Sequence, residues 1–168
     1  MGPRFVCCPV GSNYSFQRTA SPPLNSSVRS QGESYVILDI TCKTDKFNLS
    51  VVGEDFINDC CFGQDFSNWL VSKLRDAGIA ADVLCMEDFG WANTANFSGL
   101  SYLICIGGTS DQLPDQPNFG TWHIMIEPRR THMQRLRGKG TVSASDPVIS
   151  KIVQIITAAG FSSVAVEP

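Results

Sequence analysis

Three strand-like runs follow one another between residues 79 and 106 with only short turns between them. They are Ile79–Met86, Trp91–Phe97 and Leu100–Ile106, and a fourth run, Thr121–Glu127, comes after the long loop Gly107–Gly120. Neighbouring parallel strands need a crossover of about a dozen residues or more, whereas antiparallel strands need only a short turn. This spacing predicts an antiparallel sheet rather than a doubly wound nucleotide-binding fold.

Runs at both ends of the domain extend the predicted sheet. Tyr35–Ile40 and Asn48–Gly53 precede the three runs, and Phe161–Val166 follows them. Leu100–Ile106 is apolar at successive positions, as is typical of a central strand. Thr121–Glu127 alternates instead, which predicts one buried face. The inward residues of that run are expected to be Trp122, Ile124 and Ile126.

Two segments have the period of helices that bury one face. The first is Asp65–Ala77, and Gly78 after it supplies the left-handed conformation that ends many helices. The second begins at Asp146-Pro147, where Asp can cap free amides and Pro fits the first turn, and it ends at Gly160. Their apolar faces consist of Phe66, Trp69, Leu70, Leu74 and Ala77, and of Val148, Ile149, Ile152, Val153 and Ile156. We therefore expect an α+β fold, with a mainly antiparallel sheet of about five to seven strands and two principal helices packed on one face.

A tail is expected to precede this domain. The sequence predicts a single domain over residues 35–168 and a tail over residues 1–34, whose Pro-, Ser- and Asn-rich composition lacks an apolar period and indicates disorder. Residues 15–29 read Ser-Phe-Gln-Arg-Thr-Ala-Ser-Pro-Pro-Leu-Asn-Ser-Ser-Val-Arg. This run resembles the translated recombination site that flanks mobile integron gene cassettes. The resemblance implies that residues 1–29 are a recombination scar on a bacterial accessory protein of the mobile gene pool, and the alternative is an ordinary flexible tail.

Composition narrows the classes of function. The net charge of −3 argues against a general nucleic-acid binder, which needs a basic face. No run reaches the roughly 20 apolar residues that span a bilayer, and no signal peptide is recognisable, so we expect a cytoplasmic protein without a membrane partner. Seven cysteines without a C-x-x-C pair fit a reduced protein in which Cys85 and Cys105 are small buried apolar residues. No metal-binding, phosphate-loop or hydrolase motif occurs, so neither a metal nor a cofactor is expected.

The densest group of polar and aromatic residues is Glu87-Asp88-Phe89-Gly90-Trp91, at the end of a predicted strand. A carboxylate beside aromatic rings can have a raised pKa and act as an acid or base. A simpler interpretation is a turn in which Asp88 accepts backbone amides and Gly90 adopts a positive φ. If the group belongs to a pocket, the expected ligand-binding residues are Glu87, Asp88, Trp91, Trp122 and His123.

Cys60 and Cys61 precede the first predicted helix, whose dipole would lower the pKa of a thiol. A nucleophilic thiol also needs a base, and the chain has only His123 and His132. A cysteine nucleophile is therefore a minor hypothesis, and the catalytic residues stay unassigned.

Basic residues are concentrated in residues 129–140, which hold five of the thirteen Lys and Arg and no acid. The rest of the chain then has eight basic against sixteen acidic residues. One interpretation is a solvated short helix and loop, and the other is a contact for an acidic partner. The basic positions are Arg129, Arg130, Arg135, Arg137 and Lys139.

The leading hypothesis is a small binding or interaction module of the immunity or adaptor type, with an acidic protein partner or a second copy of itself. No aromatic residue interleaves the basic ones for base stacking, so nucleic acid is disfavoured as a partner. The alternative is a small-molecule-binding protein or enzyme with a pocket near Glu87, Trp91, Trp122 and His123.

Overall fold

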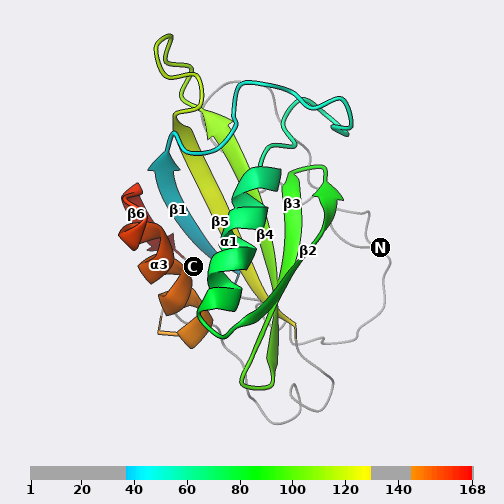
Figure 1. Cartoon of the computed structure of the whole chain (residues 1–168), viewed down its shortest axis with the longest axis vertical. Coiled ribbons are helices and arrows are strands. Elements are labelled where there is room, and N and C mark those ends of the chain that lie inside the picture. The colour runs from blue at the N-terminus through cyan, green and yellow to red at the C-terminus, as the bar shows by residue number, and fades with distance from the viewer. Residues whose placement is uncertain (1–36, 130–144, 168) are drawn as a thin grey trace, which may run out of the picture.

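The computed structural model describes residues 37–129 and 145–167, which form one six-stranded antiparallel sheet and two helices (Figure 1). The strands are β1 (Leu38–Thr44), β2 (Ala80–Glu87), β3 (Gly90–Phe97), β4 (Leu100–Ser110), β5 (Gly120–Arg129) and β6 (Ser162–Glu167). The helices are α1 (Gln64–Asp76) and α3 (Pro147–Ala158). The predicted α+β class is thus confirmed, with six strands and two principal helices.

The strand order in the sheet is β2-β3-β4-β5-β1-β6. Strands β2 to β5 form a meander, in which each strand pairs with the next one along the chain. Strand β1 lies between β5 and β6, with Ile40 opposite Ile124 on one side and opposite Val166 on the other. Strands from the two ends of the domain, β1 and β6, therefore lie next to each other at one side of the sheet. Short-range sequence patterns do not predict this pairing.

Both helices lie on the same face of the sheet, in front of the strands in Figure 1. On this face every second residue of β1 is buried, and β5 contributes Trp122, Ile124 and Ile126 as the alternation predicts. Helix α1 adds Phe66, Leu70 and Leu74 to the same core, and α3 adds Ile149, Ile152 and Ile156. The residues between these positions point to the opposite face, where most side chains are only half-buried.

The predicted helix ends are confirmed. Gly78 and Gly160 follow the two helices with φ angles of 80° and 81°, in the left-handed region. Asp146 caps α3, because its Oδ1 accepts a 2.9 Å hydrogen bond from the backbone N–H of Val148. Pro147 occupies the first turn, where no backbone donor is needed.

Two predicted segments are corrected. Residues 48–53 form a loop rather than a strand, because the Asn48 side-chain oxygen accepts the backbone N–H groups of Ser50 and Val51 at 3.2 and 2.9 Å. This local bonding holds the backbone in a turn that competes with a strand ladder. The predicted loop Gly107–Gly120 is shorter, since β4 continues to Ser110 and β5 starts at Gly120. The short helix expected within residues 129–140 lies, beyond Arg129, outside the described residues.

Candidate functional site

A groove of about 470 Å³ lies on the face of the sheet opposite the two helices. We call this face the open face, because neither α1 nor α3 packs on it. The groove is lined mainly by apolar and sulfur-containing side chains from β2 to β5, with charged groups among them. The lining residues are Ile37, Leu84, Cys85, Glu87, Phe89, Ala92, Leu103, Cys105, Met125, Glu127 and Arg129.

A row of small and sulfur-containing residues crosses the sheet and forms the floor of the groove. Cys85 is paired with Ala92, Ala92 with Cys105, and Cys105 with Met125. Because side chains of paired residues lie on the same face, these four project together onto the open face. The small Ala92 in the middle of the row leaves a depression between the longer side chains.

The turn after β2 closes one end of the groove. Phe89 lies in this turn and lines the groove. A Cβ atom on Gly107 would come within 2.5 Å of the Phe89 carbonyl oxygen, so glycine at position 107 permits this close approach of the turn to β4. A larger residue at position 107 would therefore push the turn, and Phe89 with it, away from β4.

Three charged side chains line the groove: Glu87 on β2, and Glu127 and Arg129 on β5. None of them forms an ion pair with another residue in the described part of the chain. Burial, together with the nearby carboxylates of Glu127 and Glu87, raises the pKa of the Cys105 thiol to about 11, and the charge of Arg129 opposes this shift. Cys105 is thus a neutral thiol at pH 7 and contributes to an uncharged floor.

An Asp–His pair borders the groove on the β1 side. Nδ1 of His123 lies 2.7 Å from Oδ2 of Asp39, which is itself the register partner of Met125 in the groove floor. The hydrogen bond to Asp39 raises the pKa of His123, burial opposes this effect, and the charges of Asp39 and Glu167 add to it. The protonated imidazole is therefore favoured beside the apolar floor.

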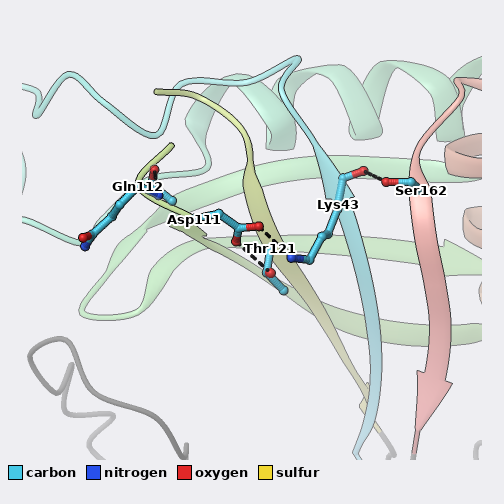
Figure 2. Close-up of polar contacts among 6 residues, drawn as sticks. Lys43, Asp111, Gln112, Thr121 and Ser162 are labelled. Carbon is cyan, nitrogen blue, oxygen red and sulfur yellow. Dashed lines mark hydrogen bonds and ion pairs between the residues drawn. The ribbon is translucent and has the colours of Figure 1, made fainter. Parts of the chain in front are cut away.

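Further along the open face, polar contacts fix the loop between β4 and β5 (Figure 2). Nζ of Lys43 on β1 lies 2.6 Å from Oδ2 of Asp111, and Thr121 donates its hydroxyl to Oδ1 of Asp111 at 3.4 Å. Lys43 also lies 5.8 Å from the centroid of the Phe119 ring. These contacts hold the loop between β4 and β5 against the sheet, and none of the residues that form them lines the groove.

The residues predicted for a pocket do not converge. Glu87 lines the groove, and His123 projects from the same face into its pair with Asp39. Trp122 is fully buried on the helix-covered face, and Trp91 donates its indole N–H to the carbonyl of Cys61 at 3.2 Å. Asp88 is exposed in the turn and does not line the groove.

Sequence reasoning missed most of the groove, including Leu103, Met125 and Glu127. The sequence does contain a pattern that points to the groove. Leu100–Ile106 is apolar on both faces of its strand, whereas the two predicted helices cover only one face of the sheet. Apolar residues that face away from the helices require a second cover or form a binding surface.

The predicted basic contact is only partly within the described residues. Arg129 lies at the groove and is exposed. The other four predicted positions lie outside the described residues, and they are Arg130, Arg135, Arg137 and Lys139.

The hypothesis of a cysteine nucleophile gains no support from the described residues, where Cys60 is disulfide-bonded, contrary to the predicted reduced state, and no histidine is paired with Cys61. Cys61 is fully buried, and its thiol donates to the backbone oxygen of Glu87 at 3.2 Å. His123 is engaged with Asp39 on the open face, and His132 lies outside the described residues.

Within residues 37–129 and 145–167, no three His, Cys, Asp or Glu side chains come together as metal ligands. No helix in these ranges has the length and apolar character needed to cross a membrane.

The fold and groove define a class of protein: an α+β domain with an antiparallel sheet that is covered by helices on one face and grooved on the other. The sequence matches no protein-family model, and neither a curated protein nor a solved structure is significantly similar to the chain.

Proposed function

We propose that this protein is a small binding module and that the groove on the open face receives the apolar part of its ligand. The observation that carries the proposal is the apolar floor, Cys85-Ala92-Cys105-Met125, on the face that α1 and α3 leave uncovered. Small-molecule sites are mostly apolar concavities of roughly 300–1,000 Å³ with a few polar groups. A groove of about 470 Å³ with three charged residues fits that description.

The binding energy would come mainly from burial of apolar surface. Removing apolar area from water stabilises a complex by roughly 25 cal/mol per Å². Met125 and Leu103 are already half-buried in the free protein, so the floor is largely preformed. A preformed floor lowers the ordering cost of binding.

Nile red, a neutral apolar dye, tests this proposal. We expect its fluorescence to increase with the full-length protein, and we expect Met125→Gln to weaken binding by roughly three- to tenfold. Gln has a length close to that of Met but places an amide on the floor. The matched control is Val51→Gln, because Val51 is an apolar residue that is 68% exposed and does not line the groove.

Dye binding that is equally weakened by both variants, or by neither, would contradict a site in the groove. Circular dichroism spectra of the two variants must first match that of the wild type. The adaptor- or immunity-type role and the acidic partner for the basic residues stay predictions from the sequence, and pull-down and light scattering test them.

A further inference from the structure

We infer that the ligand of this groove is an organic cation, an ammonium group carried on an apolar body. The inference rests on the proposed function and adds the charge of the ligand to it.

Two of the three charged lining residues are carboxylates, Glu87 and Glu127. Glu87 lies on edge strand β2, opposite Gly90, and Glu127 lies on β5, opposite Leu103. The apolar floor between these strands thus has a carboxylate toward each side. No described residue forms an ion pair with either one, so both carboxylates are available for a cation bound in the groove.

Arg129 is the single cation among the lining residues, and it does not cancel the carboxylates at the floor. Cys105 lies in the middle of the floor, and the charges of Glu127 and Glu87 each affect the pKa of its thiol more strongly than the charge of Arg129 does. Arg129 and Glu87 are both exposed, so solvent screens their charges, whereas Glu127 is half-buried and its negative charge is screened less. An ammonium group near the floor is therefore attracted, and a carboxylate is repelled.

The apolar surroundings strengthen this preference. Coulomb interactions grow as the local dielectric constant falls, and bound apolar matter would displace water from Ala92, Leu103 and Met125. A neutral ligand would gain the apolar contacts but would leave both carboxylates without a counter-charge. A cation with an apolar body satisfies both features of the site.

Three probes of similar shape separate charge from apolar contact: phenylbutylamine, phenylbutanol and phenylbutyrate. We expect each to displace Nile red from the full-length protein in proportion to its affinity. The amine should bind roughly three- to tenfold more tightly than the alcohol, and the carboxylate more weakly than the alcohol. The preference for the amine should decrease at high salt.

Charge-removing variants then locate the effect. Glu87→Gln and Glu127→Gln should each lower the affinity for the amine while leaving the alcohol unchanged. Arg129→Gln should raise the affinity for the amine. Glu54→Gln is the matched control, since Glu54 is an exposed carboxylate that does not line the groove, and it should change none of the three affinities.

The outcomes distinguish the two proposals. Equal binding of amine and alcohol at the groove would overturn the cationic ligand and leave the binding module intact. Tighter binding of the carboxylate, lost in Arg129→Gln, would show that the ligand is an anion. Absence of any displacement, together with Nile red binding that Met125→Gln does not weaken, would overturn the binding function and the inference with it.

Discussion

His123 on β5 and Asp39 on β1 form a diagonal pair across the open face. Their side chains meet at 2.7 Å although their backbones are not directly opposite, since Thr41 is the register partner of His123 and Met125 that of Asp39. Diagonal neighbours in antiparallel strands are within reach of long side chains. The pair therefore links the central strand β5 to β1, whose position in the sheet depends on contacts between distant parts of the chain.

The Asp39–His123 pair predicts a specific pH dependence. The pKa of His123 is raised in the folded protein, chiefly by the hydrogen bond to Asp39, above an unfolded value of about 6.5. Its contribution to stability is then complete below that value and is lost as pH rises through the folded pKa. We expect Asp39→Asn to reduce the free energy of unfolding more at about pH 5.5 than at about pH 8.5.

NMR titration of the His123 ring and urea unfolding at the two pH values measure these effects. In Asp39→Asn the pKa of His123 should fall, whereas Glu54→Gln should leave it unchanged. A wild-type His123 that titrates at or below the ordinary histidine value would contradict the prediction.

The second prediction concerns Gly90, which starts β3 with a φ of 142°. A Cβ atom there would clash with the carbonyl oxygen of Ile106 and lie 3.0 Å from the Cα of Gly107. We expect Gly90→Ala to lower the free energy of unfolding by more than about 2 kcal/mol, through both strain and overpacking. Urea unfolding followed by circular dichroism measures this.

Gly99→Ala is the matched control for Gly90. Gly99 also has a positive φ, 77°, but its added Cβ would meet nothing within 4 Å. It should cost only about 1–2 kcal/mol, the backbone contribution alone. Equal costs at the two positions would show that the close approach of β3 to β4 is not needed.

Much of the fold could be predicted because local patterns and long-range packing agree. The alternation in Thr121–Glu127 predicts the buried face of β5, and Asp146-Pro147 predicts the start of α3. The prediction failed at Asn48–Gly53, where Val51 and Val52 suggest a strand by their β-branched side chains. The hydrogen bonds of Asn48 keep that segment in a turn, and both valines are exposed.

The site was harder to predict because it is made of residues from five separate segments. The alternation that places Trp122 inward and His123 outward also separates them, so a pocket containing both conflicts with the geometry of a strand. Cys105 and Met125 become neighbours only through the register of β4 with β5. That register depends on packing between distant parts of the chain, which cannot be read from local sequence patterns.

The third prediction concerns Tyr102 and Asp146, which connect β4 to the start of α3. The Tyr102 hydroxyl donates to Oδ2 of Asp146 at 2.9 Å, while Oδ1 of the same carboxylate caps Val148. Asp146→Ala should cost about 1 kcal/mol for the cap and a further ~1–3 kcal/mol for the unpartnered hydroxyl. Tyr102→Phe removes that hydroxyl and should cost about 1 kcal/mol.

A double-mutant cycle measured by urea unfolding tests this coupling. The double variant should be less destabilised than the sum of the single variants, because its buried hydroxyl is gone. Asp146→Asn retains one oxygen that can accept from the Val148 N–H, and its amide nitrogen can donate to the Tyr102 hydroxyl, so it should cost less than Asp146→Ala. Simple additivity would mean that Tyr102 and Asp146 act independently.

The last prediction uses the thiol of Cys85 to report on the charge at the groove. Cys85 is exposed, contrary to the burial predicted for it from the sequence, whereas Cys42 and Cys61 are buried. Burial and the charge of Asp39 raise the pKa of Cys42 to about 12. Among Cys42, Cys61, Cys85 and Cys105, we therefore expect iodoacetamide to label Cys85 first at neutral pH. The labelled peptides can be counted by mass spectrometry.

Glu87 should slow this labelling. The pKa of the Cys85 thiol is raised by desolvation, by its 3.4 Å hydrogen bond to the Glu87 carboxylate and by the charge of that carboxylate. Glu87→Gln removes the charge, so a larger fraction of Cys85 is thiolate and its labelling should be roughly threefold faster. Glu54→Gln should leave the rate unchanged. An unchanged labelling rate in Glu87→Gln would mean that the Glu87 carboxylate does not raise the pKa of the Cys85 thiol. It would also count against a cationic ligand on the β2 side of the groove.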